Sequence, residues 1–571
     1  MQILIKRKVD GPSVPELGTP TSVTFESITV PLNRASTGPA ALAQYELQRS
    51  LDGSTWSTIA TGPSIFGNPP VQFVDGGRIA LTTYYYRARA LDVAGRASAY
   101  SATVSATTAA TIAPSTALLF PRVGSYWIGN FDYELTSVQQ AAAQFDLLIW
   151  NMAETWGSWK PQPRSFAACC AAVKAINPAI KLFQYVNPYD MWSRSVPASD
   201  PNPNAVTTGI YPVIESLVSS RNWWVRKEWP SGSRIISPDY NAYLLNLSIN
   251  APSNSSSYLL NGKRPIEHFL STYISDMYVQ GVYPQYHAAN PHLDGFFVDN
   301  VLIEPAHQGD WNMDGTTAPT EGGMGKSDVS TALAFRQGLA AGADALRAQF
   351  PSMTVLGNLI PYTFSAGYAR LTTNPDPTMR NKYDGALLEH WSGEFYSPET
   401  WGGPRDMINA AKSQANHLTK PDLQLMHSSR RSGSELFQDM RQAICSALVV
   451  SNGHIAYSNN SFAATGATNV GAWYDEYGNY GTLPRYYLGV AEDLPVTSES
   501  QTWTSGVYRR RFQNGWVLWN PRGNGVRTVN LGQTMRKLQG RSGFSDTTVN
   551  NGAQVTSVTL QDRDGLVLLK V

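Results

Sequence analysis

Cysteine is scarce in this sequence, and neither sign of charge is in excess. Of the 571 residues only three are cysteine, two of them adjacent at Cys169 and Cys170 and one distant at Cys445. This number and spacing match neither a disulfide framework nor a metal-ligand motif, so we expect small core side chains. The chain has 44 basic and 43 acidic residues, a net charge of +1, and no long basic run. We therefore expect no nucleic-acid partner.

Long apolar runs and an export signal are also lacking. No apolar run approaches the roughly 20 residues that a membrane-spanning helix needs, so we expect no membrane partner. The N-terminal sequence MQILIKRKVDGPSVP puts its apolar residues before the basic ones, which is the reverse of a signal peptide. The hydrophobic fraction of 42% and the 16 tryptophans are typical of well-packed soluble domains. The length predicts about three or four of them.

Short strand-like segments separated by turns occupy residues 15–110. Asp52-Gly53 predicts a hairpin turn, and the segment TTYYYRARALDVAGRASAYS alternates before a turn at Gly95. This pattern resembles the fibronectin type III β-sandwich, in which Tyr84 would take the tyrosine-corner position just before a strand. The resemblance implies a spacer or docking module and says nothing about chemistry.

From Ala117 onward, apolar strands alternate with helical segments, which is the pattern of a parallel α/β architecture. Eight such units predict a (β/α)8 TIM barrel with insertions. The predicted strands are Ser125–Gly129, Phe145–Asn151, Ile180–Asn187, Leu293–Asn300, Met353–Leu359, Tyr383–Trp391, Leu423–Ser429 and Gly453–Asn459. The helices predicted between them include Ser165–Ile176, Pro265–Gln280, Ser330–Gln349 and Ser434–Val450.

Two further segments have β-like patterns. The longest insertion, at 188–264 between the third and fourth strands, alternates around Pro230 and predicts a hairpin. After Leu488, short strands around an Asn514-Gly515 turn predict a small antiparallel β-sandwich domain. The predicted boundaries are an N-terminal segment at 1–14, the fibronectin-like domain at 15–110, a linker at 111–116, the barrel at 117–490 and the C-terminal domain at 491–571.

Two of the predicted strands share one design. LDGFFVDN and YDGALLEHW each open with Asp-Gly, continue as an apolar run and end on a carboxylate, Asp299 in the first and Glu389 in the second. Active sites of such barrels lie at the C-terminal ends of the strands, and paired carboxylates perform acid/base or nucleophile/acid chemistry. We predict that Asp299 is the nucleophile or base and Glu389 the general acid. An apolar wall, which Trp391 could supply, would keep Glu389 protonated.

Polar and aromatic side chains collect at the other strand ends. Indole rings stack on sugar faces, while amides and acids bind hydroxyls, so this composition suits a neutral carbohydrate. Each of these residues taken alone also fits a packing or structural role, and only their convergence favours a site. Trp150 and Trp391 are predicted platforms for sugar rings. The full set of predicted substrate contacts is Trp127, Trp150, Asn151, Glu154, Asn187, Asn300, Asn358, His390, Trp391 and His427.

The region from Leu118 to the C-terminus resembles the TIM-barrel "hypothetical glycosyl hydrolase" proteins. The resemblance lies in LDGFFVDN, the GNLI and LLEHW strands, and the WYDEYG…LG run at 473–489. Related glycosidases of the α-galactosidase type place an Asp nucleophile after the fourth strand and the acid after the sixth. Asp299 and Glu389 fall on those strands, although the second residue is Glu rather than Asp. The resemblance implies hydrolysis of glycosidic bonds in a bacterial polysaccharide, by a retaining or an inverting course.

The fibronectin-like module, the missing signal peptide and the all-β C-terminal domain also resemble bacteriophage tail depolymerases. That resemblance implies a virion or extracellular location, a host polysaccharide as partner, tail proteins bound through the N-terminal segment, and a homo-oligomer. Two alternatives stay open: a non-catalytic carbohydrate- or receptor-binding tail protein on the same barrel, and a bacterial glycosidase unrelated to phage. A lyase or deacetylase has less support, since a deacetylase needs a His/Asp metal set that the sequence does not offer.

The loop after the fourth strand, GDWNMDGTTAPTE, meets the calcium-loop pattern D-x-N-x-D-G-x5-E. Alternate side chains would converge on one hard cation, Gly315 would permit the sharp turn, and the last Glu would supply two oxygens. Pro319 and the lack of flanking helices mean that this is not a complete EF-hand. We predict a structural Ca²⁺ beside the sugar site, with no cofactor needed for the chemistry. Its ligands would be Asp310, Asn312, Asp314, Thr316 through its carbonyl, and Glu321.

Overall fold

The computed structural model separates the chain into two compact units. One comprises Met1–Leu118 with Glu492–Leu494, and the other Leu119–Ala491 with Pro495–Val571. The structure describes residues 11–21, 28–38, 41–62, 65, 72–75, 82–108, 118–127, 135–150, 163–191, 223–237, 242–251, 263–273, 290–316, 327–358, 378–393, 397–429, 436–458, 473–481 and 483–571.

The first unit is a β-sandwich of two antiparallel sheets. One sheet has the order β1-β2-β5 and the other β4-β3-β6-β7. Both sheets contribute to one core, for example Val30 of β2 with Tyr45 of β3 and Tyr86 of β6. The strands are β1 (Glu16–Leu17), β2 (Ile28–Arg34), β3 (Leu42–Ser50), β4 (Ser57–Gly62), β5 (Gln72–Asp75), β6 (Thr83–Asp92) and β7 (Val104–Thr107).

The sequence pattern explains the second of these sheets. Every second residue of β6 is buried, which is the alternation expected of a strand with one face on the core. Asp52-Gly53 lies in the turn between β3 and β4, where Gly53 has a φ of 73° and the Asp52 carboxylate accepts the backbone N–H groups of Ser54 and Thr55. The predicted hairpin is therefore confirmed. Tyr84 lies inside β6 rather than before it, and its ring is buried in the sandwich core.

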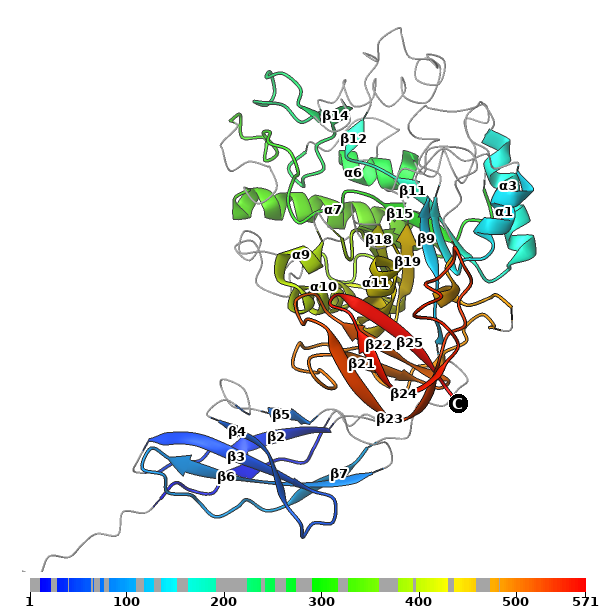
Figure 1. Cartoon of the computed structure of the whole chain (residues 1–571). Helices are drawn as coiled ribbons and strands as arrows, with labels where there is room; N and C mark the ends of the chain where they lie inside the picture. The colour runs from blue at the N-terminus through cyan, green and yellow to red at the C-terminus, as the bar shows by residue number, and fades with distance from the viewer. Residues whose placement is uncertain are drawn as a thin grey trace, which may run out of the picture. The chain divides into compact units, whose positions relative to one another are not determined.

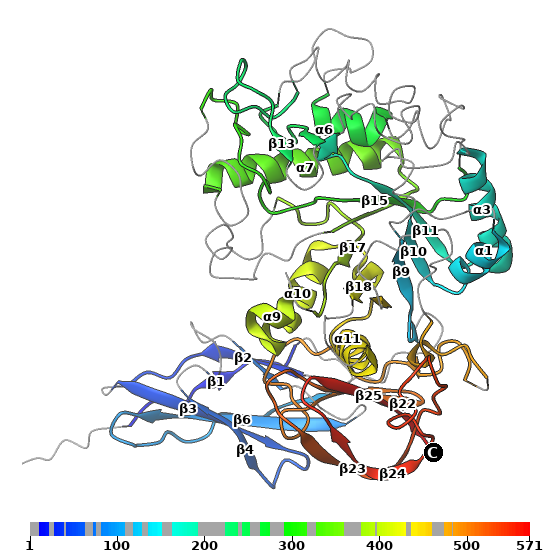
Figure 2. The same cartoon turned by 45° about the horizontal axis from the view of Figure 1, so that its top comes forward.

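The second unit is built on eight parallel strands that curl into a nearly closed barrel (Figures 1 and 2). A parallel bridge between Val123 and Ile455 joins the first and last of them. Seven of the predicted barrel strands contain an observed one, and the first, Ser125–Gly129, overlaps one that begins a residue earlier, so the predicted order is confirmed. The strands are β9 (Gly124–Trp127), β10 (Leu147–Trp150), β11 (Lys181–Val186), β15 (Gly295–Val298), β16 (Thr354–Gly357), β17 (Gly385–Leu388), β18 (Gln424–Ser429) and β19 (His454–Ser458).

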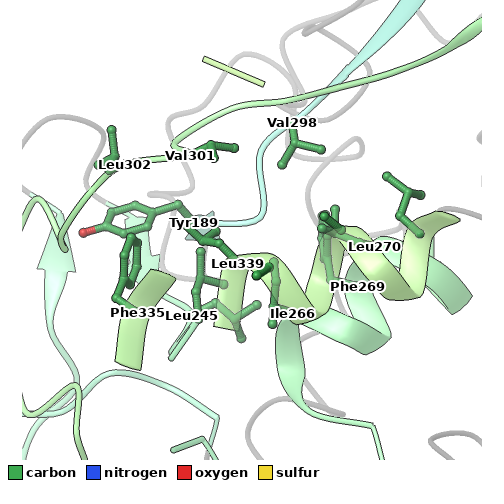
Figure 3. Packing of buried hydrophobic residues seen from close by; sticks show 14 of the residues in the cluster. Tyr189, Leu245, Ile266, Phe269, Leu270, Val298, Val301, Leu302, Phe335 and Leu339 are labelled. Atoms are coloured by element: carbon green, nitrogen blue, oxygen red, sulfur yellow. The ribbon is translucent and has the colours of Figure 1, made fainter. Parts of the chain in front are cut away.

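Helices pack on the outer face of the barrel strands. Figure 3 shows Val298 of β15 above the helices that carry Ile266 and Leu339, and all three residues belong to the same buried cluster. Three of the predicted helices are confirmed as α3, α7 and α11, and the predicted start at Pro265 is that of α6. The helices are α1 (Thr136–Ala142), α3 (Pro163–Ile176), α6 (Pro265–His268), η1 (Phe269–Tyr273), α7 (Val329–Gln349), α9 (Pro398–Gly402), α10 (Pro404–His417), η3 (Pro421–Leu423), α11 (Leu436–Val450) and η4 (Asp475–Tyr477). No helix among the described residues is both long and apolar enough to cross a bilayer.

The insertion between β11 and β15 contains small antiparallel pairings. An antiparallel bridge joins Arg226 to Arg234, as the hairpin around Pro230 predicts. Three short strands of the same insertion form a sheet of order β12-β14-β13. These strands are β12 (Asp190–Met191), β13 (Ile236–Ser237) and β14 (Ala242–Leu244).

The C-terminal region differs from the predicted sandwich, because it is one five-stranded antiparallel sheet of order β21-β22-β25-β23-β24. Helix α11 contacts β22 and β25 and is buried over most of its length, so it supplies the second layer that a sandwich would take from another sheet. The sheet and the barrel consequently share one compact unit. The strands are β21 (Tyr508–Phe512), β22 (Gly515–Asn520), β23 (Arg527–Lys537), β24 (Gln554–Leu560) and β25 (Asp564–Lys570), and β8 (Leu119–Phe120) pairs with β20 (Gly489–Val490) nearby.

Candidate active site

The two predicted catalytic carboxylates extend from the C-terminal ends of the fourth and sixth barrel strands, β15 and β17. Side chains of a strand alternate between its two faces. Phe297 and Leu387 belong to the cluster that fills the barrel interior, whereas their neighbours Val298 and Ala386 pack under the outer helices. Asp299 and Glu389 lie two residues beyond Phe297 and Leu387, so both carboxylates face the barrel interior at its mouth. Each keeps part of its surface exposed.

Asp299 is surrounded by hydrogen-bond donors. The hydroxyl of Tyr185 on β11 donates to its Oδ2, and the side-chain amide of Asn358 donates to its Oδ1. The backbone N–H of Asn300 also donates to Oδ1, at 2.8 Å. The amide of Asn358 is oriented by its own oxygen, which accepts the N–H of Val301 at 2.8 Å. Three donors aimed at one carboxylate favour its ionised form.

Glu389 has a different environment. Among the residues that the structure describes, no hydrogen-bond donor reaches its carboxyl group. Burial, and after it the negative charge of Asp299, raises the pKa of Glu389 to about 8. Burial also raises the pKa of Asp299, and the hydrogen bonds from Tyr185 and Asn300 oppose that shift without cancelling it. Asp299 is therefore the group that ionises first, and Glu389 is the group that holds a proton at neutral pH.

The predicted polar contacts lie around this pair. The side-chain amide of Asn300 donates to Oδ1 of Asn187 at 3.2 Å, and the same oxygen accepts the N–H of Tyr189 at 2.9 Å. His427 on β18 is buried, and its Nε2 lies 2.9 Å from Oγ of Ser458 on β19. Burial, and after it the neighbouring His390, lowers the pKa of His427 to about 3, so that its imidazole is neutral. The site thus offers neutral polar groups beside two carboxyl groups.

The three tryptophans with described positions are placed differently from the prediction. Trp127 and Trp150 directly follow the interior residues Tyr126 and Ile149, so the alternation of the strands turns both indoles to the outer face. There they pack edge to face, with ring centroids 6.2 Å apart. Trp391 is fully buried, and its indole N–H donates to Oγ of Ser446 on α11 at 2.8 Å. These positions are those of packing residues, and none of the three presents an indole face to the barrel mouth.

Tyr185 is the site residue that sequence analysis missed. It lies two residues before Asn187, so the alternation along IKLFQYVN was a signal that Tyr185 and Asn187 share a face. The apolar character of the strand concealed which face was the inner one. Asn151 and Glu154 lie outside the described residues.

The predicted calcium loop folds as a sharp turn. Gly315 has a φ of 93° at the position where the motif requires glycine. Oδ2 of Asp310 accepts the N–H of Gly315 at 3.0 Å and that of Trp229 at 2.7 Å. Oδ1 of Asp314 accepts both the N–H and the hydroxyl of Thr316. The turn and the donor chemistry fit a calcium loop, although amide hydrogens already engage the Asp310 carboxylate.

The remaining part of the calcium motif cannot be placed, because Glu321 lies outside the described residues. Within the described ranges, no three His, Cys, Asp or Glu side chains are grouped so as to hold a metal ion.

Comparisons with known proteins give short partial likenesses. No protein-family model matches the sequence, and no curated protein matches it. The sixth fibronectin type III domain of human fibronectin type III domain containing protein 3 is 22% identical with a TM-score of 0.17, over 19% of this chain and 94% of that one. A second solution structure of a fibronectin type III domain from human fibronectin type III domain containing protein 3 is 20% identical with a TM-score of 0.16, over 19% of this chain and 94% of that one. The β-1,2-glucanase of Parabacteroides distasonis is 20% identical with a TM-score of 0.15, over 27% of this chain and 17% of that one. Matches this short carry no functional argument, which rests instead on the geometry of the site.

Proposed function

We propose that the barrel is a glycoside hydrolase in which Asp299 is the nucleophile or base and Glu389 the general acid. The observation that carries this proposal is the pair of interior-facing carboxyl groups with opposite environments. Three donors stabilise the charge of Asp299, while burial and the charge of Asp299 keep Glu389 protonated. One carboxyl group whose charge is stabilised by hydrogen bonds, beside another that burial keeps protonated, is the arrangement that acid/base catalysis requires.

The chemistry follows from these two states. Glu389 gives its proton to the glycosidic oxygen as the bond to the anomeric carbon breaks, which lets the leaving sugar depart as a neutral alcohol. Asp299 either attacks the anomeric carbon itself or takes a proton from the water that attacks it. Asn187, Asn300, Asn358, His390 and His427 are the polar groups available at the same strand ends to bind sugar hydroxyls.

We further propose that the substrate is a bacterial surface polysaccharide or exopolysaccharide and that the protein acts as a phage tail depolymerase. The support is the combination of a β-sandwich unit with a separate compact barrel unit. In this proposal the N-terminal unit attaches the enzyme to other tail proteins in a homo-oligomeric particle, on the virion or outside the cell. A structural Ca²⁺ in the 310–321 loop would steady the segment that follows Asp299.

The test is to incubate the pure protein with a panel of capsular, exopolysaccharide and O-antigen preparations and to measure new reducing ends. Asp299→Asn and Glu389→Gln should each lower the hydrolysis rate about 10²- to 10⁴-fold or more while leaving substrate binding intact. Asp294→Asn and Asp384→Asn are matched controls, because they remove a carboxylate from the opposite ends of the same strand segments. Hydrolysis that survives in both active-site variants would contradict the proposal. Binding of a polysaccharide without any new reducing ends would favour a non-catalytic binding protein.

A further inference from the structure

The two oxygens of the Asp299 carboxylate are not equivalent. A carboxylate oxygen has two lone-pair positions for hydrogen bonds. Oδ1 accepts two donors, the backbone N–H of Asn300 and the side-chain amide of Asn358. Oδ2 accepts one described donor, the hydroxyl of Tyr185. Oδ2 is therefore the oxygen that keeps a lone pair available for chemistry.

We propose that Oδ2 of Asp299 is the reacting oxygen and that Tyr185 is the positioning residue that holds it. This inference rests on the proposed glycoside hydrolase function and extends it to one atom and one further residue. In the retaining course, Oδ2 forms the bond to the anomeric carbon while the glycosidic bond breaks. The electron pair of that bond stays with the leaving oxygen, which takes the proton of Glu389. In the inverting course, Oδ2 instead takes a proton from water as the water oxygen bonds to the anomeric carbon.

The surroundings of Tyr185 suit a fixed donor. Its side chain is 2% exposed in the barrel interior, and its ring centroid lies 5.8 Å from that of Phe297 and 6.3 Å from that of Tyr126. Burial, and after it the charge of Asp299, raises the pKa of Tyr185 well above its usual value, so the phenol keeps its proton. A rigid phenol that cannot ionise holds Oδ2 in one direction and stabilises its negative charge until the reaction consumes that charge.

The decisive variant is Tyr185→Phe, which removes this donor and keeps the ring. The matched control is Tyr189→Phe, which removes an equally buried hydroxyl whose described partners are the backbone N–H groups of Ala306 and His307. We expect Tyr185→Phe to move the acid limb of the kcat/KM profile up by about one pH unit, because a hydrogen bond to a charged group is worth about one to two pKa units. Its kcat should fall about ten- to hundredfold with little change in KM. Tyr189→Phe should leave the acid limb in place.

A second variant covers the case in which Tyr185→Phe does not fold. Site-specific 3-fluorotyrosine at position 185 keeps the shape of the side chain and makes its hydroxyl a stronger donor, so it should move the acid limb to lower pH. The inference would be overturned if the acid limb does not move in a folded Tyr185→Phe protein or in the fluorotyrosine protein. If Asp299→Asn is inactive in the same assay, the proposed function itself would still stand. Full activity of Asp299→Asn would instead overturn the proposed function on which the inference rests.

Discussion

Asn300 and His390 share a left-handed backbone conformation, with φ values of 58° and 55°, and each directly follows one of the two proposed catalytic residues, Asp299 and Glu389. Residues other than glycine rarely adopt this conformation, which costs about 1 kcal/mol or more. It changes the direction of the chain immediately after Asp299 and Glu389, so the regular alternation of each strand ends at its carboxylate. The segments that contain β15 and β17 therefore share a left-handed residue after the carboxylate, as well as the Asp-Gly pair before the strand.

The rate of hydrolysis is expected to depend on pH through the protonation of Glu389. Because the acid must carry its proton, activity should fall as pH rises through about 8, the pKa to which burial and the charge of Asp299 raise this carboxyl group. The measurement is kcat/KM against pH with an aryl glycoside and a natural polysaccharide. An aryl glycoside with a good leaving group needs little protonation, so Glu389→Gln should retain more activity on it and should lose the alkaline limb. An alkaline limb that is the same in the wild type and in Glu389→Gln would contradict the assignment.

Removing the carboxylates at the other ends of these strands should affect stability rather than chemistry. Oδ2 of Asp384 accepts the N–H of Val355 at 2.9 Å, and Oδ1 lies 3.1 Å from Arg347. Asp384→Asn should therefore lower the free energy of unfolding by about 1–3 kcal/mol while kcat stays unchanged. Although burial raises the pKa of Asp384, the hydrogen bonds from Thr419 and Val355 and the charge of Arg347 give a net lowering. A carboxyl group whose pKa is lower in the folded state stabilises the fold at pH values above its pKa in the unfolded chain. This stabilisation is lost as the pH falls through the pKa of the folded state.

The stability difference between wild type and Asp384→Asn should accordingly shrink in acid. Thermal melting of the two proteins at neutral and at acid pH measures this difference. If Asp384→Asn lowered kcat as much as Asp299→Asn does, the two ends of the strands would not be functionally distinct.

Glu476 should destabilise the folded protein at alkaline pH. It is 1% exposed, and its Oε1 accepts the side-chain amide of Asn550 at 2.7 Å and the hydroxyl of Ser545 at 3.0 Å. Burial raises its pKa to about 7 from an ordinary value of 4.5. When the pKa of a group is higher in the folded state, its contribution to the free energy of unfolding is complete at pH values below its pKa in the unfolded chain. The contribution is lost as the pH rises through the pKa of the folded state. Glu476→Gln should therefore melt at a higher temperature than wild type at about pH 9, and the two curves should converge at about pH 5. A difference that does not depend on pH would contradict this prediction.

Calcium should raise the melting temperature if the 310–321 loop binds it. Binding to the folded state alone stabilises that state by mass action, so a chelator should lower the melting temperature and millimolar calcium should restore it. Asp314→Asn should weaken this response, while Asp562→Asn, a change in a distant C-terminal turn, should not. Identical melting curves in chelator and calcium, with no metal found by elemental analysis, would exclude the site.

The barrel should remain folded and active without the N-terminal unit. The compact units separate between Leu118 and Leu119, a few residues beyond Pro114, where the composition is that of a linker. A protein that begins after Pro114 should keep the kcat of the full chain on a soluble polysaccharide and should lose attachment to the particle. A truncated protein that is unfolded by circular dichroism would contradict the predicted boundary.

The local pattern of the sequence was sufficient for the strand order and for the positions of Asp299 and Glu389 at two strand ends. Short apolar runs ending in polar residues identified all eight strands, because a strand buried on both faces must be apolar and its polar end must reach the surface of the barrel. The repeated Asp-Gly start and carboxylate end also placed Asp299 and Glu389 after the fourth and sixth strands. That pattern is absent from IKLFQYVN, so Tyr185 was not predicted as a site residue.

Which side of each strand faces inward was decided by the tertiary structure. An apolar strand has no alternation of polar and apolar residues that would distinguish its two faces. Trp127 and Trp150 were therefore predicted to line the barrel mouth, although each lies one residue after a side chain that faces the interior. Which of Asp299 and Glu389 holds a proton likewise depends on hydrogen-bond donors and charges at the ends of β11, β15, β16 and β17. Those groups are far apart along the chain and meet only when the parallel strands close into a barrel, because a pKa is set by neighbours in space and not in sequence.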